Sequence, residues 1–342
     1  MQKVDIQQVI NAKNRIDKYI NQTPILTSSQ LNSWLGHDIF FKAECLQKIG
    51  AFKARGAANT IAWLVENNQK PDRIIANSSG NHAQAVAWAS SMFGIPSTIY
   101  MPEYSSKIKI QATTAYGADV VLCQSRTEAD EKVKQAATVP GNYWIPPFNH
   151  EQIIYGQATA AYDAIKEIKD VDAVIAPCGG GGLLSGTYIS TKALLPKAEV
   201  IGAEPLNAND AAQSLRTGKI QRLQSVPDTL ADGAMTNAIS ELTFEYLKEL
   251  NEFYEVDETQ MTYWTQWLSH LLKVQVEPTS ALSMEAARQW LTKQSGKKRV
   301  LIILSGGNID QGTHQRLWEK DFLSTHPAID VEIASAVMMT DR

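Results

Sequence analysis

The sequence lacks the long runs of charge or of apolar residues that mark several classes of protein. It has 32 Lys and Arg residues against 36 Asp and Glu residues, a formal net charge of −4, and no long basic run. This balance favours neither nucleic acid nor a membrane as a partner. No apolar stretch reaches the roughly 18 residues that span a bilayer, and the N-terminus lacks the apolar run of a signal peptide. We therefore expect the chain to act in the cytoplasm.

Cysteine is also scarce. Cys45, Cys123 and Cys178 are odd in number, lie far apart and stand in apolar, strand-like surroundings, so we expect buried thiols. No CxxC pair or His and Cys cluster suggests a metal site. The chain has no internal repeat and no low-complexity segment, and its length allows one large or two medium domains.

What the sequence does contain is an alternation of short β-type runs with helical segments. From Arg73 to Cys123 these segments are, in order, 74–76, 81–93, 97–101, 105–115 and 119–123. Such compact alternation implies a parallel sheet covered by helices. We predict a separate small domain at 73–150.

The alternation resumes after residue 150 and predicts a larger domain, built from residues 1–72 and 151–322. Its expected helices and strands are 5–20, 38–44, a helix of about 15 residues from Lys53, 151–168, 173–177, 183–193, 199–203, 259–273, 279–293, 299–304 and a last helix from about 309. Residues 323–342 show no clear pattern and are predicted to form a C-terminal tail.

Lys53 is the residue around which these elements are organised. It stands at the start of a probable helix, between a turn and a face of small residues formed by Ala54, Ala57 and Ala58. A partly desolvated amine near the positive end of a helix loses proton affinity, and a neutral lysine can form a Schiff base with an aldehyde. Most lysines are solvated surface charges, so this position alone does not decide the function.

A four-glycine loop, Gly179–Gly182, follows an apolar strand and precedes Leu183 at the start of a helix. Its backbone N–H groups can converge on an anion such as a phosphate. It does not follow the dinucleotide pattern, although Glu204 lies about 20 residues further on, and no Gly-Lys-Ser/Thr completes a P-loop. The alternative is a tight strand-to-helix turn without a ligand.

Two more loops follow strands in the same way. Asn77-Ser78-Ser79-Gly80-Asn81-His82 offers amides and hydroxyls suited to a carboxylate, or it is an ordinary capped turn. Ser305-Gly306-Gly307-Asn308 places a serine where it can bond a ligand or cap the next helix.

These four segments, in this order and spacing, resemble pyridoxal-phosphate (PLP) enzymes of the tryptophan-synthase-β fold type (fold type II). The likeness is greatest to serine racemases and serine/threonine dehydratases, and it extends over about residues 5–320. It implies an α/β fold with two open, mostly parallel, twisted sheets covered by helices. It also implies a homodimer and a small domain that closes over the substrate.

The resemblance implies a role for each matching residue. Lys53 would hold the cofactor covalently and act as the base at the substrate Cα. Further cofactor contacts would come from Phe52, Asn81, Asn149, Gly179, Gly180, Gly181, Gly182, Leu183 and Ser305, with Ser305 at the pyridine nitrogen. The substrate carboxylate would be held by Ser78, Ser79, Asn81 and His82.

The activity implied is that of an L-serine and L-threonine ammonia-lyase (dehydratase) combined with a serine racemase. Ser79 matches the serine that returns a proton to Cα in racemases, where common threonine dehydratases have alanine. An alternative is an ammonia-lyase for threo-3-hydroxyaspartate, which an additional cationic side chain near the pocket would favour. His82 disfavours β-replacement enzymes of the cysteine-synthase type. A catalytically silent PLP-binding regulatory protein is the alternative from another class.

The resemblance also implies effectors. Glu204, Ala208 and Asp210 match an all-oxygen site for Mg²⁺, or for Ca²⁺ or Mn²⁺. Ser28 and Ser29, with Gln47 and Lys48, match part of an ATP site in mammalian racemases. Asp130 stands where those racemases place an arginine near the substrate, so the substrate preference does not transfer. About 30 residues follow Asn308, which is too few for the feedback domain of threonine dehydratases.

Overall fold

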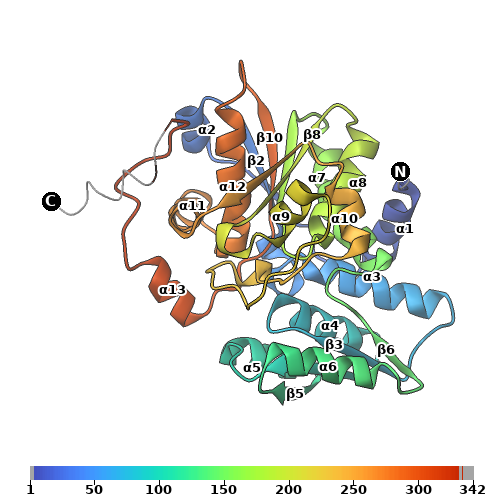
Figure 1. The fold of residues 1–342 in the computed structure, drawn as a ribbon. Helices are drawn as coiled ribbons and strands as arrows, with labels where there is room; N and C mark the ends of the chain where they lie inside the picture. The colour runs from blue at the N-terminus through green and yellow to red at the C-terminus, as the bar shows by residue number, and fades with distance from the viewer. Residues whose placement is uncertain (1–3, 331–332, 334–342) are drawn as a thin grey trace.

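A computed structural model describes residues 4–330 and 333. In these residues the strands form two separate sheets, each covered by helices (Figure 1). This is the predicted α/β architecture with two mostly parallel sheets. No helix of this part of the chain is both long and apolar enough to cross a membrane.

The larger sheet has six strands in the order β1-β2-β10-β7-β8-β9. The strands are β1 (Ile25–Leu26), β2 (Asp38–Ala43), β7 (Ala173–Pro177), β8 (Glu199–Pro205), β9 (Glu252–Val256) and β10 (Arg299–Leu304). β1 is antiparallel to β2, and the other neighbours are parallel. The central strand β10 is a run of branched apolar residues because helices cover both faces of a parallel sheet.

The smaller sheet has four parallel strands in the order β5-β4-β3-β6. They are β3 (Arg73–Asn77), β4 (Ser97–Pro102), β5 (Asp119–Cys123) and β6 (Asn142–Trp144), with helices α4 (Asn81–Met92), α5 (Lys107–Ala115) and α6 (Arg126–Ala136) between them. The sequence predicted three of these strands and missed β6 and α6. All four strands fall inside the predicted range 73–150, while the domain boundaries themselves stay a prediction.

The remaining helices surround the larger sheet. They are α1 (Ile6–Ile16), α2 (Ser29–Leu35), α3 (Lys53–Glu66), α7 (Glu151–Ile168), α8 (Gly182–Leu194), α9 (Asp210–Thr217), α10 (Glu241–Leu247), α11 (Glu258–Leu272), α12 (Pro278–Leu291) and α13 (Gln311–Leu317). Of the predicted tail 323–342, residues 331–332 and 334–342 lie outside the described residues. The part that is described packs on α11, where the Thr325 carbonyl accepts hydrogen bonds from Tyr263 and Trp267.

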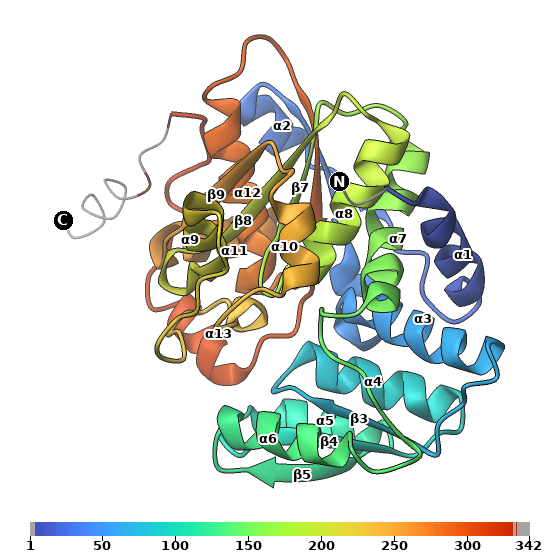
Figure 2. The same cartoon turned by 45° about the vertical axis from the view of Figure 1, so that its right-hand side comes forward.

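Helix α3 lies between the two sheets, with the small-sheet block on one side and α7 on the other (Figures 1 and 2). It approaches α7 at a glycine contact: a Cβ atom added to Gly156 would lie 2.6 Å from the Cα of Gly56. Real Cβ atoms do not come that close, so α7 needs glycine here. This contact sets the position of the helix that begins with Lys53.

The first turn of α3 is also anchored by a buried ionic network. Arg55 donates to both carboxylate oxygens of Glu44 at 2.7 and 2.8 Å and to Asp163 at 2.9 Å, and Arg55 and Glu44 are fully buried. Burial raises the pKa of Glu44, but the charge and hydrogen bonds of Arg55, helped by Lys42 and Thr23, together hold it below its usual value. Because a buried charge is expensive without its partner, the network fixes the backbone two residues after Lys53.

Candidate functional site

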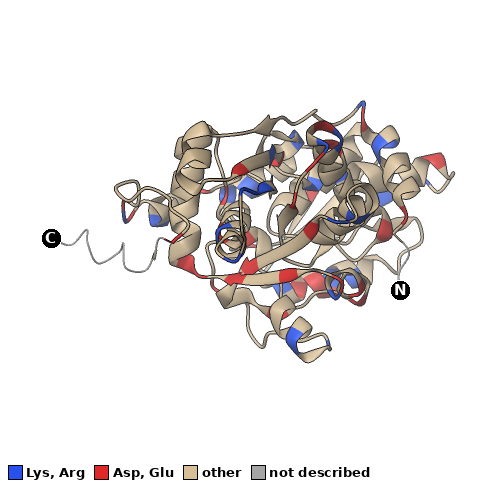
Figure 3. Cartoon of the chain, turned by 90° about the horizontal axis from the view of Figure 1, so that it is seen from above, with Lys and Arg blue, Asp and Glu red and all other residues tan. Residues whose placement is uncertain are grey.

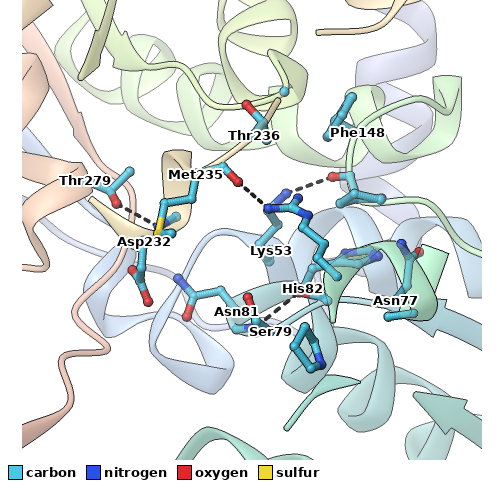
Figure 4. Close-up of a pocket in the computed structure, with 18 of the residues that line it drawn as sticks. Lys53, Asn77, Ser79, Asn81, His82, Phe148, Asp232, Met235, Thr236 and Thr279 are labelled. Carbon is cyan, nitrogen blue, oxygen red and sulfur yellow. Dashed lines mark hydrogen bonds between the residues drawn. The ribbon is translucent and has the colours of Figure 1, made fainter. Parts of the chain in front are cut away.

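A cavity opens between the two sheets, and several predicted site residues meet there (Figure 4). Those that line it are Phe52, Lys53, Ser78, Ser79, Asn81, His82 and Gly180. Lys53 comes from α3, the next four from the loop after β3 and the start of α4, and Gly180 from the loop after β7. The structure therefore brings together segments that are more than a hundred residues apart in the sequence.

Lys53 is half-buried, and its Nζ donates a hydrogen bond to the carbonyl of Pro147 at 2.8 Å. Burial lowers the pKa of this amine to about 8, although the nearby Glu277 carboxylate acts in the opposite direction. A larger fraction of Lys53 is therefore neutral near physiological pH than of an ordinary lysine. This is the property that Schiff-base chemistry requires.

The turn before Lys53 is tied to the loop that contains Ser305. The amide of Phe52 donates to the Ser305 carbonyl at 2.9 Å, next to the isolated bridge between Ala51 and Gly306. Ile49 has φ 59°, a value that is rare for a β-branched residue. The Asn308 side chain stabilises this turn by donating from Nδ2 to the Ile49 carbonyl at 2.7 Å. Residues held this way cluster at functional sites.

His82 lies in the cavity wall as a neutral imidazole. Burial lowers its pKa to about 3, and Nε2 bonds the Ile145 carbonyl at 2.9 Å, so Nε2 carries the ring proton. Among the described residues, Nδ1 has no hydrogen-bond partner. The free side of the ring is therefore an acceptor, and donors for a carboxylate in this loop come from backbone amides and hydroxyls rather than from the imidazole.

The four-glycine loop is packed tightly against Phe148. A Cβ atom at Gly180 would lie 2.0 Å from Cδ1 of that ring, so only glycine fits there. The rest of the predicted phosphate loop, namely Gly179, Gly181, Gly182 and Leu183, adjoins Gly180 without lining the cavity. Asn149 is exposed and does not line it either, whereas its neighbour Phe148 does.

Ser305 is fully buried and reaches the cavity only through a neighbour. Its Oγ lies 3.0 Å from Ser280 Oγ and donates to Glu277 at 3.4 Å. Glu277 lines the cavity, although it is 1% exposed, and burial raises its pKa to about 7. Sequence reasoning missed Glu277, because a glutamate before Pro278 is typical of an ordinary helix start.

Sequence reasoning also missed charged residues around the opening. Arg126 and Asp130, one turn apart on α6, line the cavity, and the Arg126 guanidinium donates a hydrogen bond to the Met235 carbonyl. Asp232 lines it too and forms an ion pair with Lys109 of α5. The α6 residue that supplies a cation to the pocket is thus Arg126, four residues before the Asp130 to which sequence alignment pointed.

The three residues predicted to hold a metal lie together at the end of β8 and the start of α9. Among the described residues neither carboxylate oxygen of Asp210 has a hydrogen-bond partner, and burial raises its pKa to about 7. Burial also raises the pKa of Glu204, and within the described part of the chain its carboxylate accepts hydrogen bonds from the Ala212 and Ala211 amides alone, at 2.6 and 3.3 Å. Two buried carboxylates without a cation fit an oxygen-ligated divalent metal. No cluster of three His, Cys, Asp or Glu side chains able to hold a metal was found in the described residues.

Two of the four residues predicted to bind ATP already make hydrogen bonds within the protein. Ser28 caps α2 by accepting from the Leu31 amide, and Gln47 accepts from the Asn21 and Lys48 amides. Ser29 and the Lys48 side chain are exposed. Along the described part of the chain, positions of Lys and Arg are interspersed with positions of Asp and Glu, as Figure 3 shows.

Comparisons with known proteins agree on one family. The family model described as "Pyridoxal-phosphate dependent enzyme" matches residues 16–306. The chain is 40% identical over 311 residues to L-threo-3-hydroxyaspartate ammonia-lyase of Saccharomyces cerevisiae, covering 90% of this chain and 94% of that protein. It is 40% identical over 304 residues to serine racemase of Schizosaccharomyces pombe, covering 88% and 93%. The solved structure of a T.th. threonine deaminase superposes with a TM-score of 0.84 at 37% identity, covering 90% and 99%.

Proposed function

The chain belongs to the family of pyridoxal-phosphate-dependent enzymes, and from this premise we propose that it is an ammonia-lyase and racemase of 3-hydroxy amino acids, with L-serine and L-threonine as substrates. The observation that carries the proposal is the partly buried Lys53 amine, with its lowered pKa, facing a cavity beside the loop that holds Ser79 and Asn81. Pyridoxal phosphate, when bound, withdraws electrons from the substrate Cα and so weakens its C–H bond.

In this proposal Lys53 removes the Cα proton, and the β-hydroxyl takes up a proton and leaves as water. The released enamine then reacts with one water molecule to give a 2-oxo acid and ammonia. Ser79 returns a proton to Cα and gives the other enantiomer. Ser78, Ser79 and the amides at the start of α4 hold the substrate carboxylate, with His82 contributing through its backbone. A positioned acid or base contributes about 10²–10⁴ in rate.

The proposed cofactor contacts follow the same logic. Phe52 and Asn81 line the cavity together with Lys53 and are assigned to the ring, while Gly179–Leu183 are assigned to the phosphate. Ser305 is assigned to the pyridine nitrogen. Asn149 stays a prediction, and Phe148 is the residue of that segment that lines the cavity.

L-threo-3-hydroxyaspartate is the second candidate substrate, and one observation favours it. Arg126 supplies the additional cationic side chain near the pocket that a second substrate carboxylate needs. The protein from Saccharomyces cerevisiae that is 40% identical to this chain carries the name of that activity. Asp130, one turn further along α6, opposes an anionic substrate, so the two side chains compete in setting the preference.

A divalent cation, Mg²⁺ or else Ca²⁺ or Mn²⁺, is proposed at Glu204, the Ala208 carbonyl and Asp210. The support is the pair of buried carboxylates without a cation partner. A homodimer, an ATP effector near Ser29 and Lys48, a cytoplasmic location and closure of the small domain at 73–150 stay predictions from the family resemblance.

The proposal is tested by incubating the PLP-loaded protein, with Mg²⁺, separately with L-serine, L-threonine and L-threo-3-hydroxyaspartate, while 2-oxo acid and D-amino acid are followed. We expect 2-oxo acid from at least one substrate and D-serine from L-serine. Ser79→Ala should lose racemisation by about 10²-fold or more and keep most elimination. Equal loss of both activities would refute the role of Ser79. A loaded protein that turns over none of the three would leave the catalytically silent alternative.

A further inference from the structure

Glu277 is a buried carboxylate in the cavity wall that the proposed mechanism does not use. It precedes α12, and it caps no amide of that helix with its side chain. Within the described residues no Lys, Arg or His nitrogen lies within 4.0 Å of it, so it has no direct ion-pair partner. A buried charge of this kind is costly, and its presence needs an explanation.

The carboxylate connects two segments of the site. Asn81 at the start of α4 donates to its two oxygens at 3.3 and 3.1 Å, and Ser305 and the Asn308 amide donate at 3.4 and 3.3 Å. Asn308 closes the frame, because its side chain donates to Asn81 Oδ1 at 2.8 Å. Glu277 therefore contacts both side chains that the proposed function assigns to the polar edge of the cofactor ring, Asn81 and Ser305.

The charged groups that face Glu277 come from several elements. Lys53 of α3 and Lys109 of α5 act on it as cations, while Asp232 repels it. Cys45 faces it as a thiol. Burial and Asp232 raise the pKa of Glu277 to about 7, and the cations and donors act against that rise, so both protonation states are accessible near neutral pH.

We propose that Glu277 is a positioning residue of the cofactor site: its carboxylate holds Asn81 and Ser305 in one hydrogen-bonded frame and places a negative charge in the cavity that Lys53 also lines, where it acts on the nitrogen by which Lys53 would join the cofactor. This inference rests on the proposed function only for the assignment of Asn81, Ser305 and Lys53 to the cofactor. It does not depend on which amino acid is turned over.

The sign of the effect follows from electrostatics. A negative charge near the Lys53 nitrogen favours its protonated form, so removing that charge makes the nitrogen lose its proton at lower pH. A residue that only packed the site would not move this titration. The discriminating measurement is therefore the visible absorbance of the bound cofactor as a function of pH, since the absorbance reports the protonation of the lysine nitrogen joined to it.

The experiment compares the PLP-loaded protein with loaded Glu277→Gln, without substrate. Glu285→Gln is the matched control, since Glu285 is a fully buried carboxylate within α12, the helix that Glu277 precedes, and it contacts Trp264 and Arg288 outside the cavity. We expect the absorbance transition of Glu277→Gln to move to lower pH by about 1–3 units. The control should titrate like the unchanged protein. A Glu277→Gln titration that coincides with the unchanged protein would overturn the proposal.

Glu277→Asp keeps the proposal testable if the glutamine variant does not fold. The shorter side chain retains the charge and withdraws from Asn81 and Ser305, so the titration should stay close to normal. The loss of one or two hydrogen bonds, each worth about 1 kcal/mol net, should weaken cofactor retention by about five- to thirtyfold in equilibrium dialysis. Unchanged retention would overturn the positioning role. Because neither assay uses substrate, failure of this inference is distinguishable from failure of the proposed activity.

Discussion

Replacing Arg126 by glutamine tests which substrate the pocket prefers. The guanidinium now donates to the Met235 carbonyl, a neutral acceptor, and a substrate β-carboxylate would take over that donor. Both bonds have a charged donor and contribute about 1.5–3 kcal/mol net, and the bond between opposite charges lies at the upper end of that range. The difference, up to about 1.5 kcal/mol, corresponds to as much as roughly 13-fold in kcat/KM for hydroxyaspartate.

The assay is the ratio of kcat/KM for L-threo-3-hydroxyaspartate to that for L-serine, measured on the same preparation. Arg126→Gln should lower the ratio by that factor because serine has no second carboxylate. Lys132→Gln on the same helix is the control for lost charge, since Lys132 pairs with Glu128 and does not line the cavity. A ratio unchanged in Arg126→Gln, or lowered equally in Lys132→Gln, would show that Arg126 does not bind the second carboxylate of the substrate.

Three further predictions concern the anchoring and loading of the site. Glu44→Gln should lower the free energy of unfolding by about 3–5 kcal/mol in urea titrations, because Arg55 is left buried without its full partner; a loss below about 1 kcal/mol would contradict this. Covalent loading of the apoprotein with PLP should quicken as pH rises through about 8, where neutral Lys53 accumulates, and then level off; a rate that climbs steadily toward pH 10.5 would indicate an ordinary lysine. Chelation of the divalent cation should lower the melting temperature. Added Mg²⁺ at about 100 times its Kd should then raise the free energy of unfolding again by about 2.7 kcal/mol. Asp210→Asn should lose this response, and a melting temperature indifferent to chelator would argue against the cation site.

The strands and the longer helices could be predicted because their signals are local. The apolar run Arg299–Leu304 and the alternation from Arg73 to Cys123 are visible in single windows of sequence, and both form strands of the two sheets. The first helix was predicted to reach residue 20 but ends at Ile16. Strand β6 was missed, because three half-buried residues form a strand only through pairing with β3.

Site residues could be predicted where neighbouring residues in the sequence form a recognisable motif. They could not be predicted where residues far apart in the sequence meet only in the folded chain. Lys53 and the glycine loop are recognisable from their neighbours. Arg126 was missed because the orientation of α6 in the fold decides which of its side chains face the cavity. The resemblance to racemases pointed only to Asp130. Glu277 lies 196 residues from Asn81 in the chain, and only the fold brings them into contact.

The two sides of the cavity are held by contacts of different kinds. On the α3 side, Arg55 donates two hydrogen bonds to Glu44, and both side chains are fully buried. Breaking this pair would leave a buried charge without its partner, so the α3 side is held rigidly. On the other side, Asp232 is exposed, and its pair with Lys109 is accessible to solvent that can replace the partner. Of these two contacts the pair of Asp232 with Lys109 is the easier to separate, and its separation leaves Lys53 in place, as the proposed role of Lys53 as the base at Cα requires.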